Sequence, residues 1–283
     1  MPYEVEPPAV FEHLGFSQMN LAAACGEAYR RRYVEGEDPS VLNVPALCGS
    51  GLHEAIHLYE TVYQSEINRP GFTVEEAHAK TLTGLAKDSV RQILSENDID
   101  SETLVYYGKQ DLPFYFREKI PKMAESYLVW REYEAGRTRW VSGHAQDSCE
   151  VHCRLEIAGH PFESTIDQVF YDPHDRLVIR DIKTGKAKPE HAMQIEQYRV
   201  SLARGHGLAA DYGQILYING SEPKIEVVTF SLTEREVESM IARQARSIGE
   251  GLFLVNGPFN GYCQVCDFAS DCAYAGVGPR GIA

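Results

Sequence analysis

The sequence has no run of 18 or more apolar residues, so we expect no transmembrane helix and no membrane partner. Its first residues, MPYEVEPPAVFEH, lack the basic and apolar segments of a signal peptide, and we therefore expect a cytoplasmic protein. Basic residues are also scarce: 27 Lys and Arg stand against 41 Asp and Glu, a net charge of −14. This charge argues against a protein that coats nucleic acid nonspecifically, but an enzyme with a local basic groove is still possible.

The chain of 283 residues has no internal repeat or low-complexity segment and is long enough for one large domain. Helical periodicity comes first, with an N-cap expected at Ser17 and a capping box at 73–76. Runs of β-branched and aromatic residues follow and predict strands. The expected helices are 17–33, 45–63, 73–94, 113–134, 189–204 and one from Thr233; the expected strands are 139–157, 161–171, 176–183, 212–218 and 224–230. This order predicts an α/β or α+β fold.

The stretch LVIRDIKTGK (177–186) begins as a buried strand and ends in charge. Side chains alternate along a strand, so Asp181 and Lys183 continue its apolar face. A hairpin turn near 173–174 would place Asp167 opposite Asp181. Two adjacent carboxylates repel unless a proton or a cation lies between them, and such oxygen ligands suit Mg²⁺ or Mn²⁺. The segment therefore predicts a metal site, although an exposed Asp–Lys ion pair would also explain it.

The last part of the sequence is rich in cysteine. Cys263, Cys266 and Cys272 have the spacing C-x2-C-x5-C, which is typical of a metal or cluster site. The spacing alone leaves the fourth ligand open among Cys25, Cys48, Cys149 and Cys153. It also leaves zinc and a 4Fe–4S cluster as alternatives, because both accept four thiolates.

Five short motifs in order resemble the RecB-type PD-(D/E)xK nucleases, and in particular the branch with an iron–sulfur cluster. They are the Cys25 segment, GSGLH (49–53), TIDQ around Asp167, DIKTG around Asp181 and QIEQY (194–198), followed by the cysteine tail. The resemblance implies an α/β, restriction-endonuclease-like core, a mixed central sheet flanked by helices. It further implies one nuclease domain over 1–283, an N-terminal helical insertion over 65–140 and a C-terminal cysteine loop over 257–283.

The resemblance also assigns residues. It implies that His53, Asp167, Asp181 and the backbone carbonyl of Ile182 hold Mg²⁺ or Mn²⁺. Lys183 would help to activate water, and Gln194 and Tyr198 would complete the catalytic set. Cys25, Cys263, Cys266 and Cys272 would hold a structural 4Fe–4S cluster, with zinc as the alternative. Cys48, Cys149 and Cys153 would be buried thiols.

The function implied is a metal-dependent DNA exonuclease acting on single-stranded ends in recombination, repair or phage DNA processing. The protein would be bacterial or phage-encoded and could have a recombination, repair or CRISPR-type protein partner. Arg30, Arg31, Lys186 and Lys188 are candidates for DNA contacts. One alternative is a catalytically inactive DNA-binding or scaffold subunit, which the complete set of four site residues argues against. Another is a zinc-binding protein without nuclease activity.

Overall fold

The structure is a computed structural model that describes residues 13–37, 43–99, 111–157, 159–220, 222–264 and 266–275. The chain divides into two compact units, each made of separate segments. Unit 1 contains 1–43, 154–164 and 232–283, and unit 2 contains 44–153 and 165–231. The expectation of one nuclease domain over 1–283 stays a prediction. The end of the predicted cysteine tail, 276–283, lies outside the described residues.

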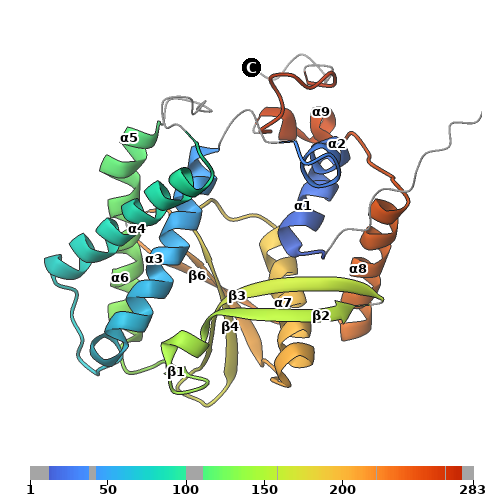
Figure 1. Ribbon diagram of the computed structural model, residues 1–283. Helices are drawn as coiled ribbons and strands as arrows, with labels where there is room; N and C mark the ends of the chain where they lie inside the picture. Colours follow the sequence, from blue (N-terminus) through green and yellow to red (C-terminus); the bar gives the residue numbers. More distant parts are fainter. Residues whose placement is uncertain are drawn as a thin grey trace, which may run out of the picture. The chain divides into compact units, whose positions relative to one another are not determined.

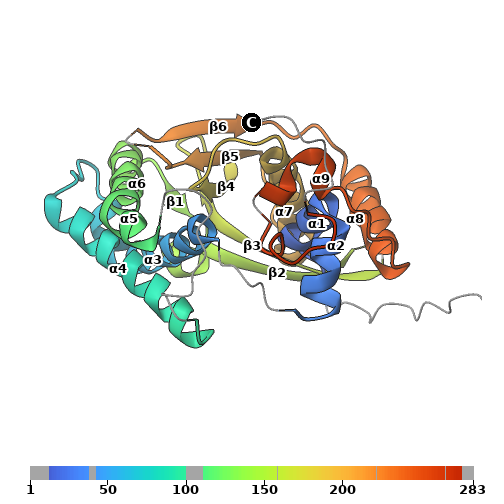
Figure 2. The same cartoon turned by 90° about the horizontal axis from the view of Figure 1, so that it is seen from above.

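The sheet has strands β1 (Arg139–Trp140), β2 (Cys149–Ile157), β3 (His160–Tyr171), β4 (Leu177–Lys183), β5 (Tyr212–Tyr217) and β6 (Lys224–Val228). Its order is β1-β3-β4-β5-β6, with β2 also paired to β3 (Figure 2). β4 and β5 are parallel, whereas β1, β4 and β6 each pair with a neighbour in the antiparallel direction. The sheet is therefore mixed, as the family resemblance implied.

Helix α7 (Glu190–His206) connects β4 to β5 and packs against both strands. A crossover of this kind is what makes two consecutive strands parallel. β4 is buried along its length up to Lys183, which explains why it begins with three consecutive apolar residues, 177–179. The result is a mixed α/β fold with a central sheet flanked by helices, consistent with a restriction-endonuclease-like core.

The remaining helices of unit 2 lie side by side in Figure 1. They are α3 (Val44–Ile67), α4 (Glu76–Glu96), α5 (Leu112–Phe114), the π-helical turn η2 (Tyr115–Lys119) and α6 (Ile120–Glu134). α4 packs against both α3 and α6. The described part of 65–140 is thus mainly helical, and its role as an insertion stays a prediction.

A buried polar network joins α3 and α6 to the sheet. Glu60 on α3 accepts hydrogen bonds from Arg131 Nε at 2.8 Å and from the Tyr127 hydroxyl at 2.5 Å. The Tyr127 hydroxyl accepts from Gln168 on β3, and Gln168 accepts from Arg180 on β4 at 2.9 Å. Buried charges persist only when they are paired in this way. The network fixes β3 and β4 at the residues next to Asp167 and Asp181.

Unit 1 contains α1 (Phe16–Ala24), α2 (Gly26–Tyr29), the π-helical turn η1 (Arg30–Val34), α8 (Glu234–Gly249), α9 (Gly257–Asn260) and the 3₁₀ turn η4 (Tyr262–Gln264). α1 packs against α8. The helix predicted over 17–33 was wrong in two respects: its N-cap is Gly15, not Ser17, and it is interrupted at Cys25. Cys25 has extended backbone with a φ of −161°, so its side chain leaves the helical path.

Two further local predictions were wrong. The capping box at 73–76 does not form; α4 begins at Glu76 after Glu75, which makes no side-chain cap. The strand expected over 139–157 is interrupted by a turn and by the 3₁₀ turn η3 (Ala145–Asp147). A true capping box does occur at Thr233, where α8 begins as predicted.

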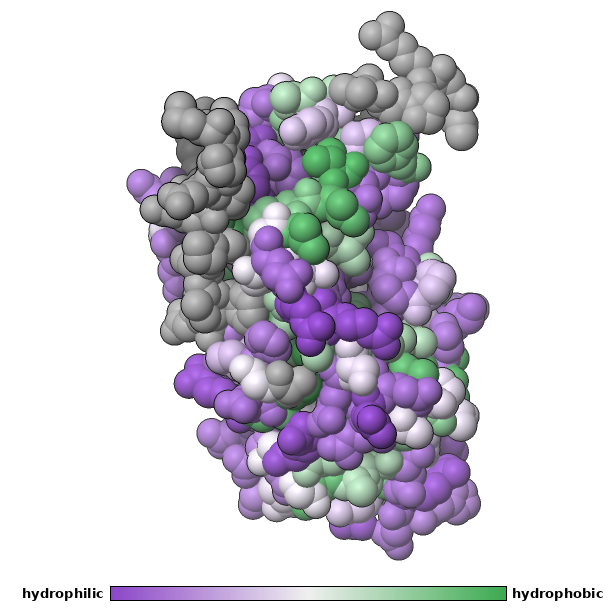
Figure 3. Space-filling view, turned by 90° about the vertical axis from the view of Figure 1, so that its right-hand side faces the viewer, coloured by the Kyte–Doolittle hydropathy of each residue, from purple (hydrophilic) through white to green (hydrophobic). Residues whose placement is uncertain are grey.

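No helix within the described residues has the length and apolar character needed to cross a membrane. Apolar side chains are nevertheless exposed near the end of the chain, among them Leu252, Leu254 and Phe259. Figure 3 looks onto the side where α8 lies and shows apolar atoms gathered amid mainly hydrophilic ones.

Candidate functional site

Three neighbouring strands of unit 2 carry acidic residues at matching positions. In the β3–β4 pair Gln168 faces Arg180, and continuing this antiparallel register by one residue places Asp167 opposite Asp181. Asp167 Oδ2 also accepts a hydrogen bond from the Ile182 backbone N–H at 2.5 Å. The two acids therefore lie on adjacent strands, as the position of the turn predicted.

The third acid is Glu150 on β2, which the sequence analysis missed. His152 Nδ1 lies 3.1 Å from Thr165 Oγ1, and the Val169 N–H donates to the Ser148 carbonyl at 2.8 Å. Both contacts belong to one antiparallel register, in which Glu150 faces Asp167. Glu150 could have been identified only from the β2–β3 register. That register depends on the length of the turn between β2 and β3, which the composition of the sequence does not define.

His53 enters the site from α3. Its Nδ1 lies 3.4 Å from Asp167 Oδ2, and ligand atoms of His53, Glu150 and Asp167 all lie within 4.8 Å of one another. Gly49, one helical turn earlier, allows α3 to approach β4 closely, because a Cβ atom there would lie 2.8 Å from Thr184 Oγ1. The G-x-x-x-H spacing thus has a steric reason.

Lys183 connects the acids to α7. Its Nζ donates to Asp181 Oδ1 at 3.0 Å and to Gln194 Oε1 at 2.8 Å. The amide of Gln194 then donates to the Tyr198 hydroxyl at 2.7 Å, one turn further along α7. The structure therefore brings together the six side chains that the sequence proposed as catalytic: His53, Asp167, Asp181, Lys183, Gln194 and Tyr198.

Burial and mutual charge control ionisation in this site. Burial disfavours the imidazolium of His53, but the neighbouring Asp167 carboxylate outweighs it and raises the pKa of His53 to about 9. Burial alone would raise the pKa of Asp167, yet the charges of His53 and Lys183 lower it. Burial, together with the charge of Asp167, raises the pKa of Asp181 to about 6 and that of Glu150 to about 7. The site thus sets three carboxyl groups against two basic groups, His53 and Lys183, and each shifts the pKa of its neighbours.

The donor set fits a divalent cation. Asp181 Oδ2 is buried and makes no hydrogen bond; Lys183 Nζ lies 2.8 Å away as an ion pair but lacks hydrogen-bond geometry. The Asp167 and Asp181 carboxylates offer oxygen ligands of the kind that Mg²⁺ and Mn²⁺ take, and the His53 imidazole adds a nitrogen ligand. His53, Asp167 and Asp181 would hold the ion. The Ile182 carbonyl as a ligand stays a prediction.

The predicted DNA-contacting cations lie in different surroundings. Lys186 and Lys188 are exposed in the loop after β4, where Lys188 lies 3.5 Å from Glu190. Arg30 and Arg31 belong to unit 1 and pair with carboxylates there. The partners of Arg30 are Glu27 and Glu35, and those of Arg31 are Glu37 and Asp271. A contact from either arginine to DNA would have to compete with these ion pairs.

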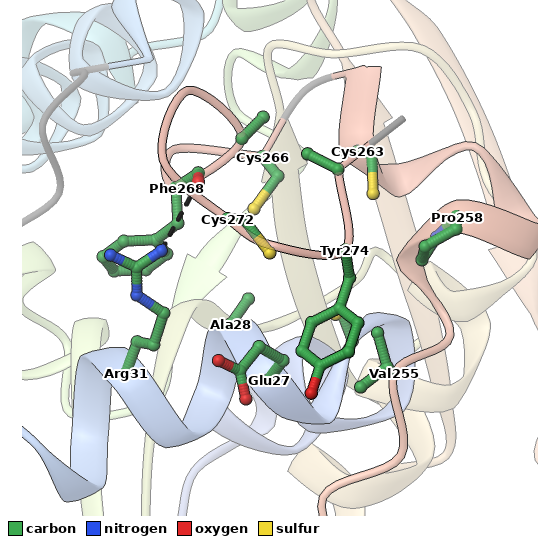
Figure 4. A pocket seen from close by; sticks show the side chains of 13 residues that line it. Glu27, Ala28, Arg31, Val255, Pro258, Cys263, Cys266, Phe268, Cys272 and Tyr274 are labelled. Carbon is green, nitrogen blue, oxygen red and sulfur yellow. Dashed lines mark hydrogen bonds between the residues drawn. The ribbon is translucent and has the colours of Figure 1, made fainter. Parts of the chain in front are cut away.

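Unit 1 contains a second candidate site, a pocket lined by Cys25, Cys263, Cys266 and Cys272. Figure 4 shows the three C-terminal cysteines projecting from one loop into the same space beside α2. The space between the lining atoms is about 300 Å³, part of it open to solvent. A Cβ atom at Gly257 would lie 3.0 Å from Cys263 Sγ and 3.3 Å from Cys25 Sγ. Residues more than 230 positions apart in sequence thus supply sulfurs to one cavity.

Burial raises the pKa of Cys263, and raises that of Cys266 to about 11. Buried thiols of this kind ionise readily only when a metal or cluster takes the thiolate. The four cysteines that line one cavity fit such a group. Cys48, Cys149 and Cys153 lie elsewhere and are buried, as expected.

A sequence model of the PD-(D/E)XK nuclease superfamily matches residues 13–273. No curated protein sequence matches the chain. Two solved structures are similar over most of their length. The crystal structure of SSO0001 is 12% identical, with a TM-score of 0.37 over 84% of this chain and 88% of that chain. A "Putative exonuclease" from Eubacterium rectale is 15% identical, with a TM-score of 0.44 over 85% of this chain and 82% of that chain.

Proposed function

Because the chain belongs to the PD-(D/E)XK nuclease superfamily, we propose that it is a metal-dependent DNA exonuclease with Mg²⁺ or Mn²⁺ as its catalytic ion. Two sets of contacts carry this proposal. His53 contacts Asp167, and Lys183 donates hydrogen bonds both to Asp181 and to Gln194 on α7. An inactive scaffold would have no physical reason to keep His53, Asp167, Asp181 and Lys183 together, because two buried carboxylates on adjacent strands repel each other.

The proposed chemistry is hydrolysis of a phosphodiester bond. A bound divalent ion supplies Lewis-acid polarisation of the phosphate and a lower pKa for water. Lys183 stabilises negative charge that develops on the phosphate and orients the attacking water. Gln194 holds the Lys183 ammonium in place, and Tyr198 holds Gln194. The position of Lys183 thus depends on Gln194, and the position of Gln194 depends on Tyr198.

We further propose a 4Fe–4S cluster in the cysteine pocket, with a structural role. A zinc ion bound by four thiolates at about 2.3 Å requires sulfurs about 3.8 Å apart. Among the described residues, only His53, Glu150 and Asp167 form a group of three or more ligand atoms within 4.8 Å. The wider spacing of the cysteine sulfurs favours a group larger than one ion.

The resemblance to the RecB-type branch supports single-stranded DNA ends as the substrate. It also supports a cytoplasmic role, in a bacterium or encoded by a phage, in recombination or repair and with a partner from one of those systems or from a CRISPR system. Lys186 and Lys188 are exposed beside the end of β4, which supports the proposal that they contact the DNA backbone.

The test is degradation of a single-stranded oligonucleotide labelled at either end, with Mn²⁺ or Mg²⁺ and with a chelator as control. The wild type should release labelled mononucleotides or short products, and a folded Asp181→Asn variant should not. A circular single strand should persist if digestion requires an end. Equal activity of wild type and variant would refute the assigned site. No activity in either, with DNA still bound, would favour the scaffold function.

Anaerobic purification tests the cluster separately. Absorbance near 400 nm with stoichiometric iron and sulfide is expected. Zinc in place of iron, with no such absorbance, would replace the cluster by a zinc site with four cysteine ligands.

A further inference from the structure

We propose that Glu150 is a further ligand of the divalent cation, on the strand next to the one that carries Asp167. The inference deepens the proposed function and rests on it. With Glu150, the metal ligands lie on three adjacent strands, β2, β3 and β4. The sequence motifs indicated ligands only on the strands that carry Asp167 and Asp181.

The position of Glu150 follows from strand pairing. The contacts between His152 and Thr165 and between Ser148 and Val169 define the β2–β3 register, which sets Glu150 opposite Asp167. Since Asp167 in turn faces Asp181, the three carboxylates form a row across the sheet. Directly opposed residues in an antiparallel pair have Cβ atoms about 4.5–5.5 Å apart, close enough for two carboxylates to share one ion.

The distances agree with coordination. A carboxylate oxygen of Glu150 lies within 4.8 Å of the ligand atoms of both His53 and Asp167, so one ion could lie between all three. No described residue forms a hydrogen bond or an ion pair with the Glu150 side chain. A half-buried carboxylate with that lack of partners has ligand positions to offer.

The backbone of Glu150 supports a functional reason for its position. Its φ is +51°, an uncommon value for a residue other than glycine and a costly one inside a strand. Strained positions of this kind concentrate at active sites and ligand-binding positions.

A second, independent observation points to a cation in the same row. Asp181 is 1% exposed, and its Oδ2 makes no hydrogen bond, although it lies 2.8 Å from Lys183 Nζ as an ion pair. A cation between the strands would give this oxygen a second positive partner and would also reduce the repulsion among the three acids.

The test is Mn²⁺ binding, measured by isothermal titration calorimetry and by the loss of the free Mn²⁺ signal in electron paramagnetic resonance. Four variants of the full chain are compared with the wild type: Glu150→Gln, Glu150→Asp, Asp167→Asn and the matched control Glu156→Gln. Glu156 is an exposed acid on the same strand. Glu150→Gln should weaken Mn²⁺ binding at least about tenfold, the loss typical even of residues that only support a ligand. Glu156→Gln should bind as the wild type does.

The outcomes separate the inference from the proposed function. If the wild type binds no Mn²⁺ and degrades no DNA, both fail. If Asp167→Asn weakens binding and Glu150→Gln does not, only the role of Glu150 is overturned. If Glu150→Asp, which keeps the charge but shortens the side chain, binds as tightly as the wild type while Glu150→Gln does not, charge and not coordination explains the effect. Circular dichroism establishes that each variant is folded.

Discussion

Lys183 has two partners, and each accounts for part of its role. Its ammonium donates to Asp181 on the same strand and to Gln194 on α7, so both elements fix its position. A lysine held in this way can act on a substrate phosphate without reorganising during the reaction, which is the main source of electrostatic catalysis.

Lys183→Met should therefore reduce kcat about 10²–10³-fold with a smaller change in KM, because the contact matters most in the transition state. Mn²⁺ binding should persist, because Lys183 is not a ligand. Steady-state kinetics on single-stranded DNA and calorimetry provide the two readouts. A change in KM alone would mean that Lys183 only binds the substrate. Lys80→Met is the matched control, since Lys80 is an exposed lysine on α4 that pairs with Glu76 and has no proposed role in the site.

Glu150 should make stability depend on pH in the metal-free protein. Burial and the charge of Asp167 raise its folded pKa to about 7, above the ordinary value of 4.5. A carboxyl with a raised folded pKa costs stability progressively as pH rises from about 4.5 to 7, and the cost is complete above 7. Glu150→Gln should raise the metal-free Tm at pH 8 by a few degrees, about 2–4 °C per kcal/mol, and change it little at pH 4.5. Thermal denaturation in chelator checks this, and an equal effect at both pH values would contradict it.

At the scale of elements, the β3–β4 turn sets the register that aligns Asp167 with Asp181. Asp172 Oδ1 accepts from the backbone N–H groups of His174 and Arg176, and its Oδ2 accepts from the Arg176 side chain and the Tyr212 hydroxyl. Burial alone would raise the pKa of Asp172, but these hydrogen bonds lower it to about 2. One side chain thus holds the turn and joins it to β5.

Asp172→Ala should lower the free energy of unfolding by about 1–3 kcal/mol, because it leaves several donors without an acceptor. Urea denaturation monitored by fluorescence measures the loss. Asp175→Asn is the control: Asp175 has a positive φ that asparagine tolerates, and its ion pair with Arg139 is exposed. It should change stability by less than about 1 kcal/mol. A similar loss in both variants would show that the turn, and not the Asp172 network, determines stability.

At the scale of the whole molecule, the cysteine pocket joins distant segments of the chain. Cys25 follows α1, whereas the other three cysteines lie between 263 and 272. Arg31 reinforces the connection through Asp271 at 2.6 Å and by stacking over the Phe268 ring. A group bound to all four cysteines closes a loop of more than 200 residues, which is where a crosslink removes the most unfolded-state entropy.

Cys25→Ser should remove or weaken the absorbance near 400 nm and lower the Tm by an amount on the order of 10 °C. Cys153→Ser is the matched control, because Cys153 is equally buried but lies outside the pocket. It should keep the chromophore and most of the stability. Loss of iron with no change in Tm would show that the group is not structural.

The sequence by itself determined the features that depend on local spacing. The alternation in LVIRDIKTGK, the turn near 173–174, the i,i+4 pair on α7 and the C-x2-C-x5-C spacing were enough to predict Asp167, Asp181, Lys183 and the cysteine pocket's C-terminal ligands. These patterns carry information because strand and helix periods fix which side chains share a face.

The features that depend on long-range packing were decided only by the tertiary structure. Glu150 joins the acids through a β2–β3 register that follows no local rule, and His53 approaches Asp167 because Gly49 lets α3 lie close to β4. The same holds for Cys25. The sequence predicted one unbroken helix around it, whereas in the structure Cys25 has extended backbone and separates two helices. Local periodicity predicts which residues share a face of one strand or helix. The distances between residues of the site depend on how strands and helices that are distant in sequence pack together.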